Sequence, residues 1–353
     1  MAKFKVVLLK HGYASVATER RIVEGAGGEF LDAETLDEVE ALRLCEDADA
    51  ILVRWWKITP ELIQRFRRCK IIVRYGIGAD NIDAAAATEA GVIVGHVPTY
   101  CLDDVSAHAL ALWLNCVRLV SRNHMKIVNG GWDDNPSAKM WRTSGRTFGL
   151  VGLGNIGQAT ARKLQGWGMR LLACDPFVDG SRAAELGVRL VDFETLCRES
   201  DFVSLHVPLL PETRHLMNAR SFGMMKQGAI LVNTARGPVV ESHALLGALE
   251  AGSLAAAGLD VFETEPLPVD SPLRHHPRVL LSDHVAWYSE ESQEALKQTV
   301  AEEAVRVCLG GLPRSLMNPE VLKKLGRWDE WVPPENVLWQ LKRLGQRAVG
   351  SGK

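Results

Sequence analysis

The chain has 353 residues, a formal net charge of −2 at pH 7 and a charged-residue share of 24%. This length suggests two or three domains, and the near-neutral charge gives no global basic field to attract nucleic acid or an anionic membrane. The apolar run Val6–Leu9 is too short for a signal peptide, and no run of ~18 apolar residues follows. We therefore expect a cytoplasmic protein without nucleic-acid or membrane partners.

Seven cysteines are spread along the sequence, and no two lie within four residues of each other. The C-x2-C spacing that is typical of zinc sites is absent. Most of these cysteines stand in apolar segments, where cysteine behaves as a small hydrophobic residue. We expect free thiols, a reducing compartment and no metal site.

The first hundred residues alternate short apolar runs with helical stretches. The expected strands are Phe4–Leu9, Ala50–Arg54, Lys70–Arg74 and Val92–Val94. The expected helices are Thr35–Cys45, Pro60–Phe66 and Asp83–Glu89. Because strands and helices alternate, the pattern predicts a parallel sheet with right-handed crossovers.

A long helix is expected from Asp104 to Val128, where Gly130-Gly131 ends it, and a second alternating series then begins at Thr147. Its expected strands are Phe148–Val151, Arg170–Cys174, Asp201–Leu205, Ala229–Val232, Ala256–Asp260 and Val279–Leu281. A helix from Ser289 to Leu309 would return the chain to the first domain. We predict a discontinuous substrate domain of residues 1–101 and 289–320, a dinucleotide-binding domain of residues 102–288, and a tail of residues 321–353.

A glycine-rich segment, Gly152–Gly157, reads G-x-G-x-x-G; it follows an expected strand and opens an expected helix. In such a loop, Gly152 permits a tight turn and Gly154 lets the backbone approach a pyrophosphate. Gly157 lets the helix pack closely on the strand. The context makes this segment a predicted dinucleotide site.

The residues around this loop indicate which dinucleotide is bound. The backbone amides of Asn155 and Ile156, at the helix N-terminus, would hold the phosphate charge. Asp175 ends the next strand, where it can accept hydrogen bonds from both ribose hydroxyls. Pro176 and Phe177 follow it instead of an arginine, so a 2′-phosphate would meet a carboxylate. The sequence therefore favours NAD over NADP.

Arg236, Glu265 and His284 each follow an expected strand. Ligands of open parallel sheets bind beyond the carboxyl ends of the strands, so we predict that these side chains converge on one cleft. An arginine binds a carboxylate bidentately, a histidine exchanges protons near neutral pH, and an adjacent carboxylate orients the histidine. With a hydride from nicotinamide C4, this set predicts a dehydrogenase of a carboxylated alcohol.

The residue pattern alone leaves two choices open. Glu263 lies two residues before Glu265, and spacing does not choose between them. His206 likewise rivals His284 as the acid/base.

At these positions the sequence resembles the D-isomer-specific 2-hydroxyacid dehydrogenase family, over about residues 50–318. The motifs of that family occur in order at Arg74–Asp83, Gly152–Gly157, His206–Leu209, Asn233–Gly237, Leu259–Phe262 with Glu265-Pro266, and His284. The resemblance implies an α/β fold in which two Rossmann-like, doubly wound parallel-sheet domains flank a cleft. It also implies a homodimer, with a dimerisation segment from the Asp104 helix up to Trp141.

The resemblance also implies roles for individual residues. Arg236 would bind the substrate carboxylate, and His284, supported by Glu265, would be the acid/base. The further substrate contacts that it implies are Tyr75, Gly76, Ile77, Gly78 and Trp287. The NAD contacts that it implies, beyond the glycine loop and Asp175, are His206, Val207, Pro208, Thr234, Ala235, Arg236, Asp260 and His284.

Two branches of the family resemble different segments of this sequence. Ala286–Glu290 is similar to the C-terminal binding proteins, which are NAD-binding corepressors. Val53-Arg54 and Arg74 are similar to 3-phosphoglycerate dehydrogenases, in which basic residues near the cleft hold phosphate. Trp55-Trp56, however, are bulky where that second branch has small residues. Asp283 departs from the proline that the family usually places before its catalytic histidine.

We therefore expect an NAD-dependent D-2-hydroxyacid dehydrogenase that acts on a small 2-hydroxy or 2-oxo acid. The alternatives are a D-3-phosphoglycerate dehydrogenase and an NADH-responsive dimeric interaction protein. The complete set of Arg236, Glu265 and His284 favours an enzyme, because a scaffold has no physical need of all three. Near the C-terminus, Asn336–Arg347 is predicted to be an amphipathic helix.

Overall fold

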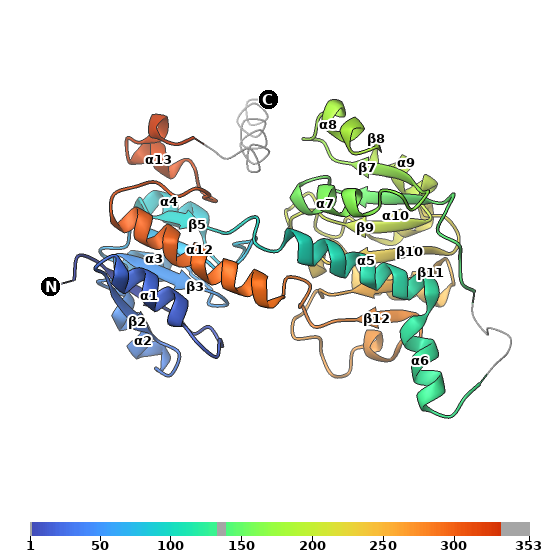
Figure 1. Ribbon diagram of the computed structural model, residues 1–353, viewed down its shortest axis with the longest axis horizontal. Helices are drawn as coiled ribbons and strands as arrows, with labels where there is room; N and C mark the ends of the chain where they lie inside the picture. Colours follow the sequence, from blue (N-terminus) through green and yellow to red (C-terminus); the bar gives the residue numbers. More distant parts are fainter. Residues whose placement is uncertain (1, 133–138, 333–353) are drawn as a thin grey trace. The chain divides into compact units, whose positions relative to one another are not determined.

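The structure is a computed structural model, and it describes residues 2–132 and 139–332. The chain divides into two compact units (Figure 1). The first unit contains the described residues of Met1–Tyr100 and Ser289–Lys353, and the second contains those of Cys101–Tyr288. The expected helix over Asn336–Arg347 lies outside the described residues.

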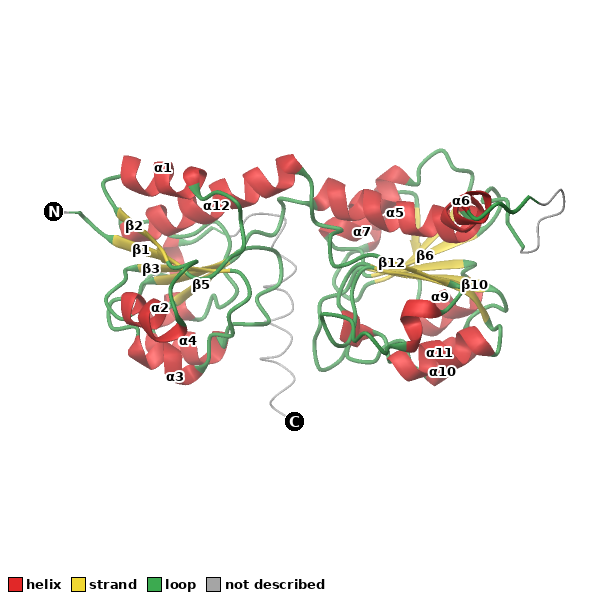
Figure 2. Ribbon diagram, turned by 90° about the horizontal axis from the view of Figure 1, so that it is seen from below, coloured by secondary structure: helices red, strands yellow, loops and turns green. Residues whose placement is uncertain are grey.

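The first unit is built on a five-stranded parallel sheet with the strand order β2-β1-β3-β4-β5. Its strands are β1 Lys5–Leu8, β2 Glu29–Asp32, β3 Ala50–Val53, β4 Ile71–Arg74 and β5 Ile93–Gly95. Its helices are α1 Ala17–Gly25, α2 Glu38–Cys45, α3 Pro60–Arg65, α4 Ala84–Ala90, α12 Glu290–Cys308, α13 Val321–Lys324 and the 3-10 turn Trp328–Glu330. Helices cover both faces of this sheet, with α1 and α12 on one side and α2, α3 and α4 on the other (Figure 2).

Helix capping explains where two of these helices begin. Helix α2 starts at Glu38, later than expected, because the Asp37 side chain accepts a hydrogen bond from the backbone N–H of Glu40. Helix α12 starts after Ser289, as expected, because Ser289 and Ser292 form a reciprocal capping box. Strand β2 and helix α1 were not among the expected elements.

The second unit is built on a seven-stranded parallel sheet with the order β12-β11-β10-β9-β6-β7-β8. Its strands are β6 Thr147–Val151, β7 Arg170–Cys174, β8 Val188–Leu190, β9 Phe202–Leu205, β10 Ala229–Asn233, β11 Leu254–Leu259 and β12 Val279–Leu281. Its helices are α5 Leu102–Arg118, α6 Val120–Val128, α7 Asn155–Lys163, α8 Gly180–Glu185, α9 Phe193–Glu199, α10 Ala219–Met224, α11 Ser242–Glu250 and the 3-10 turns Gly237–Val239 and Pro272–His275. The strand order reverses between β6 and β9, and in such sheets this is the point where dinucleotides bind.

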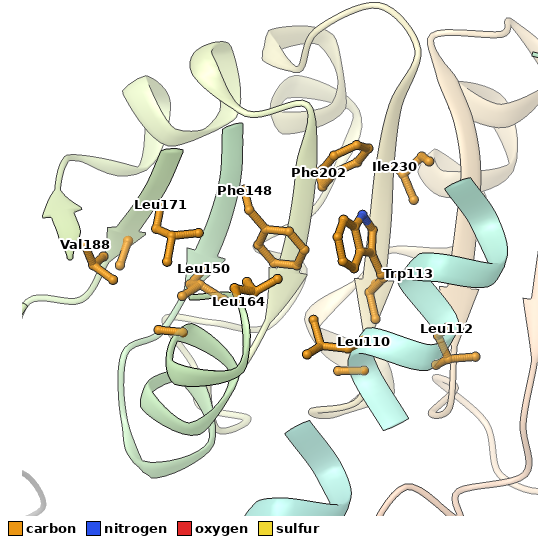
Figure 3. Packing of buried hydrophobic residues seen from close by; sticks show 14 of the residues in the cluster. Leu110, Leu112, Trp113, Phe148, Leu150, Leu164, Leu171, Val188, Phe202 and Ile230 are labelled. Carbon is orange, nitrogen blue, oxygen red and sulfur yellow. The ribbon is translucent and has the colours of Figure 1, made fainter. Parts of the chain in front are cut away.

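Helix α5 provides the largest side chain in the core of the second unit. Trp113 is fully buried, and its ring lies 5.1 Å from that of Phe148 and 5.3 Å from that of Phe202 (Figure 3). Both contacts are edge-to-face, an arrangement that adds to the stabilisation from burial. The cluster fastens α5 to the sheet whose carboxyl edge carries the predicted site.

The single long helix expected from Asp104 to Val128 is wrong. The chain breaks at Leu119, where φ is 54°, and α5 and α6 are separate helices. The Asn115 side chain stabilises the break, because its Oδ1 accepts a hydrogen bond from the backbone N–H of Ser121 at 2.9 Å. Apolar periodicity continues across such a break, so the pattern did not reveal it.

Among the described helices, none combines the length and the apolar character that a membrane crossing requires.

Candidate active site

The glycine loop joins β6 to α7 at the switch point of the second sheet. Gly152 has a φ of 94°, and a Cβ there would lie 2.7 Å from the carbonyl oxygen of His206. A Cβ at Gly157 would lie 2.3 Å from the carbonyl oxygen of Gly152. A Cβ at Gly154, in contrast, would meet no described atom within 4 Å. Two glycines therefore permit close packing, while the third leaves open space beside the backbone for a ligand.

Asp175 follows β7 and faces this loop. Its Oδ2 accepts a hydrogen bond from the Leu153 N–H at 2.8 Å, and its Oδ1 accepts one from the Phe177 N–H at 2.9 Å. These bonds hold the carboxylate next to the loop, and each oxygen keeps lone-pair capacity for a further donor. Asn155 and Ile156 form the first turn of α7, where backbone amides favour an anion.

Two buried polar atoms lie on the segments that follow β9 and β10. His206 Nε2 and Thr234 Oγ1 have no hydrogen-bond partner within the described structure. Burial lowers the pKa of His206 to about 4, so its imidazole is neutral at pH 7. Buried polar groups usually have partners, and polar groups of a bound dinucleotide would provide them. The open space at Gly154 and these two atoms fit NAD. Val207 is half-buried and Pro208 is exposed.

His284 and Glu265 form a close pair. His284 Nδ1 lies 2.6 Å from Glu265 Oε2, and Glu265 Oε1 accepts a hydrogen bond from the Phe262 N–H at 2.9 Å. Partial burial raises the pKa of Glu265, but the hydrogen bonds from His284 and Phe262 and the nearby charge of Arg236 outweigh it, and the net pKa is lowered. Glu265 is thus a carboxylate at neutral pH, and it orients the imidazole with Nε2 on the opposite side of the ring.

The neighbouring Glu263 has different partners. Its Oε1 lies 2.7 Å from His215 Nε2, and its Oε2 accepts a hydrogen bond from the Ser242 N–H at 2.7 Å. The geometry thus pairs Glu265, and not Glu263, with His284. His206 has no carboxylate partner among the described residues and is neutral through burial.

Arg236 follows β10 on a turn that Asn233 organises. Asn233 Nδ2 donates to the Arg236 carbonyl at 2.9 Å, and Asn233 Oδ1 accepts from the Ala235 N–H at 3.0 Å. A Cβ at Gly237 would lie 1.8 Å from the carbonyl oxygen of Phe262. The Arg236 turn therefore packs directly against the loop that leads to Glu265, and all three predicted catalytic residues lie at the carboxyl edge of one sheet.

Asp260 and Trp287 flank His284 in the sequence. Asp260 is buried, and its carboxylate accepts hydrogen bonds from the backbone N–H groups of Val285 and Ala286, each at 3.0 Å. Trp287 is half-buried, and its ring meets that of Tyr288 edge-on at 5.5 Å. Asp283, the departure from the family pattern, is exposed to solvent.

The remaining predicted substrate residues lie in the first unit, beyond the end of β4. Gly76, with a φ of 132°, begins the turn that continues through Ile77 and Gly78, and a Cβ there would lie 1.6 Å from Arg74 Nη1. Only a glycine therefore leaves room for the Arg74 guanidinium against this backbone. Tyr75 points to the interior, where its hydroxyl donates to Glu19 Oε1 at 2.9 Å.

The sequence reasoning did not single out His96 or Tyr13, which lie in the same unit. His96 Nδ1 lies 2.8 Å from the Ile77 carbonyl, so it supports the Gly76–Gly78 turn. The Tyr13 ring lies under the Arg54 guanidinium at 4.3 Å. Neither residue stands in a recognisable motif, and only the packing of several strand ends reveals them.

The fold and the site together define an α/β dinucleotide-binding protein with a histidine–carboxylate pair and an arginine at the carboxyl edge of one sheet. Residues 110–286 match the family described as "D-isomer specific 2-hydroxyacid dehydrogenase, NAD binding domain". The chain belongs to this family, and its second unit carries the NAD-binding domain.

Relatives and solved structures agree with this assignment. The chain is 38% identical to a D-3-phosphoglycerate dehydrogenase of Methanocaldococcus jannaschii over 85% of its own length and 58% of the relative. It is 38% identical to a glyoxylate reductase of Korarchaeum cryptofilum over 81% of its own length and 86% of the relative. A solved glyoxylate reductase structure from Paecilomyes thermophila superposes with a TM-score of 0.81 at 27% identity, covering 90% of this chain and 99% of that one. The chain thus spans little more than half of the phosphoglycerate dehydrogenase and most of the glyoxylate reductases.

Proposed function

We propose that the protein is an NAD-dependent D-2-hydroxyacid dehydrogenase that interconverts a small 2-hydroxy acid and its 2-oxo acid. The observation that carries this proposal is the 2.6 Å His284–Glu265 pair, with Arg236 beside it, on the sheet that also carries the glycine loop. An acid/base, its orienting carboxylate and a fixed cation are the groups that hydride exchange with a carboxylated alcohol requires.

In the direction of reduction, the Arg236 guanidinium binds the substrate carboxylate and polarises the adjacent carbonyl. Its backbone is held by Asn233, and its Nη1 donates a hydrogen bond to the Ala235 carbonyl at 2.8 Å, so the guanidinium is held at this turn. The Glu265 carboxylate accepts a hydrogen bond from His284 Nδ1–H, and the protonated ring donates a proton from Nε2 to the carbonyl oxygen. Bound NADH supplies the hydride from its nicotinamide ring. Gly154, Asn155, Ile156 and Asp175 would hold the phosphates and ribose.

The test follows NADH oxidation with glyoxylate, pyruvate, hydroxypyruvate, 2-oxo-4-methylthiobutyrate and phosphohydroxypyruvate. Arg236→Ala and His284→Ala should each lower kcat/KM by about 100-fold or more, while NADH still binds, because the glycine loop and Asp175 are unchanged. Arg220→Ala, which removes an exposed arginine that pairs with Glu194, is the matched control. Normal turnover by Arg236→Ala would refute the assignment.

Phosphohydroxypyruvate is the second candidate substrate, and two arginines of the first unit favour it. The Arg54 guanidinium contacts the rings of Tyr13 and Trp55, at 4.3 and 4.1 Å from their centroids, and donates to the His11 carbonyl at 2.7 Å. Arg74 lies against Gly76. If these arginines bind a phosphate, Arg54→Gln should raise KM for phosphohydroxypyruvate at least tenfold while leaving KM for glyoxylate unchanged. Equal effects on both substrates would exclude this role.

An NADH-responsive interaction protein is the alternative from a different class. This alternative would be favoured over an enzyme if NADH bound tightly and no 2-oxo acid in the panel were reduced. A pull-down from source cells with and without NADH would then test for a protein partner that depends on the nucleotide.

We also propose a homodimer that forms through helix α6. None of the nine residues of α6 is buried, and the exposed apolar residues there and just beyond are Val120, Met125, Ile127, Val128 and Trp132. A helix with this much exposed apolar surface is typical of an interface. Light scattering should find a dimer for the wild type and a smaller species for Met125→Glu; an unchanged mass would refute α6 as the interface.

A further inference from the structure

A chain of hydrogen bonds outside the proposed catalytic residues links helix α5 to the turn that carries His284. His108 Nε2, on α5, lies 2.9 Å from Ser282 Oγ, and Ser282 Oγ lies 2.6 Å from Asp260 Oδ1. A carboxylate can only accept, so the Ser282 hydroxyl donates to Asp260, and its oxygen accepts from His108 Nε2–H. The chain of bonds therefore has one direction, from His108 to Asp260, and it selects the His108 tautomer that carries the proton on Nε2.

Asp260 connects this chain of bonds to the turn. In addition to the Val285 and Ala286 N–H groups on its carboxylate, its backbone carbonyl accepts the His284 N–H at 2.9 Å. His284 has a φ of 59°, a left-handed conformation that non-glycine residues rarely adopt. Such a conformation persists where the surroundings enforce it. Asp260 holds His284 in this conformation in two ways. Its backbone carbonyl binds the N–H of His284 itself, and its carboxylate binds the N–H groups of the two residues that follow.

The packing of α5 on the sheet places His108 beside Asp260. A Cβ at Gly258 would lie 2.9 Å from Leu112 Cβ, so α5 packs directly on β11 at this point. His108 precedes Leu112 by four residues, which is about 6 Å along a helix. Asp260 follows Gly258 by two residues, which is about 6.6 Å along a strand. The step from Leu112 to His108 along the helix therefore matches the step from Gly258 to Asp260 along the strand. The His108 imidazole can thus reach Ser282 Oγ, and its Nε2 lies 3.5 Å from Asp260 Oδ1.

We propose that His108 and Ser282 are positioning residues of the reaction: they orient the Asp260 carboxylate, which in turn holds the His284 imidazole in the conformation that exchanges the substrate proton. This inference rests on the proposed function, because it gives the two residues a role only through His284. Loss of the chain of bonds leaves Arg236 and the glycine loop in place and reduces the fraction of molecules with His284 aligned. The expected effect is therefore on kcat more than on KM.

The test compares the wild type with His108→Leu, His108→Gln and Ser282→Ala. Glutamine places an amide N–H close to where the imidazole Nε2–H lies, so it can restore the donor that leucine lacks. His243→Leu, which replaces an exposed histidine on α11, is the matched control. Melting temperatures report whether each variant folds. If His108→Leu does not fold, Ser282→Ala carries the test, because it removes only one hydroxyl oxygen.

We expect kcat for 2-oxo acid reduction to fall about tenfold or more in His108→Leu and Ser282→Ala. KM for the 2-oxo acid should change less than about threefold, and His108→Gln should recover most of kcat. Amide hydrogen exchange provides a readout that needs no turnover. The peptide that contains Val285 and Ala286 should exchange faster in His108→Leu than in the wild type, and His108→Gln should slow it again.

Two results would overturn the proposal: a wild-type kcat in both His108→Leu and Ser282→Ala, or a His108→Gln variant as slow as His108→Leu. If the wild type reduces no 2-oxo acid, the proposed function fails instead. The exchange rates then decide separately whether His108 holds the turn, and unchanged rates in His108→Leu would reject that as well.

Discussion

Two histidines whose Nε2 atoms are buried should make the protein lose stability as the pH falls from 6.5 towards 4. His96 lies in the first unit and His206 in the second, and the Nε2 atom of each is buried without a hydrogen-bond partner among the described residues. Burial lowers the pKa of each imidazole from 6.5 to about 4. The charged imidazole is therefore disfavoured in the folded protein, whereas in the unfolded chain it is solvated and forms at the ordinary pKa of 6.5.

The sign and the size of the effect follow from these values. Well above pH 6.5 both states are neutral at these positions, and neither histidine affects stability. Between pH 6.5 and 4 the unfolded chain binds a proton at each site that the folded protein does not, so the free energy of unfolding falls as the pH falls. A difference of 2.5 units, at 1.36 kcal/mol per unit, lowers that free energy by up to about 3 kcal/mol per histidine. This is a large share of the roughly 5–15 kcal/mol that stabilises a typical protein.

The assay is urea unfolding at a series of pH values from 7.5 down to 4.5, for the wild type, His96→Asn and His206→Asn. Each variant removes one titrating imidazole, so its free energy of unfolding should vary less with pH than that of the wild type. His243→Asn removes an exposed histidine and is the matched control. If the two units unfold in separate transitions, each variant should affect only the transition of its own unit.

A pH dependence in His206→Asn as steep as in the wild type would refute the reasoning for that residue. It would mean that the folded protein takes up the proton near pH 6.5, and hence that the imidazole is solvated or paired with an acid. The difference between variant and wild type isolates each histidine, because the carboxylates that also titrate in this range are common to both proteins.

Three further predictions can be tested with single variants. Glu265→Gln removes the carboxylate 2.6 Å from His284 Nδ1 and should lower kcat about tenfold without weakening NADH binding; an unchanged kcat in steady-state assays would contradict the pairing. Gly157→Val would place a side chain 2.3 Å or less from the Gly152 carbonyl, so NADH binding, measured by fluorescence, should weaken strongly. An unchanged Kd would contradict the close packing of α7 on the glycine loop. Leu119→Gly should raise the free energy of unfolding, measured with urea, by about 1 kcal/mol, because glycine adopts the φ of 54° without strain. A lower free energy of unfolding would show that the leucine side chain stabilises the fold by more than its backbone strain costs.

Local signals account for most of what could be predicted. The strands of both sheets are short apolar runs followed by turn residues, so β3, β4, β6, β7, β9, β10 and β12 occur within one or two residues of the expected ranges. Edge strands such as β2 and β8 were missed, because a short, partly exposed strand has no continuous apolar run. The parallel arrangement followed from the alternation of strands with helices, which leaves few other topologies.

The sequence by itself determined the glycine loop, the acid that follows the next strand, and the polar residues that follow β10, β11 and β12, because each depends on neighbours only a few residues away. The residue pattern left Glu263 and Glu265 open and the family resemblance implied Glu265; the tertiary structure pairs Glu265 with His284 and Glu263 with His215. Only the tertiary structure decided that α5 ends at a left-handed leucine and that His108 reaches Asp260 across 152 residues of sequence. These last features depend on how a helix lies on a sheet and how two loops pack, and contacts between distant segments leave no periodic pattern in the residues that make them.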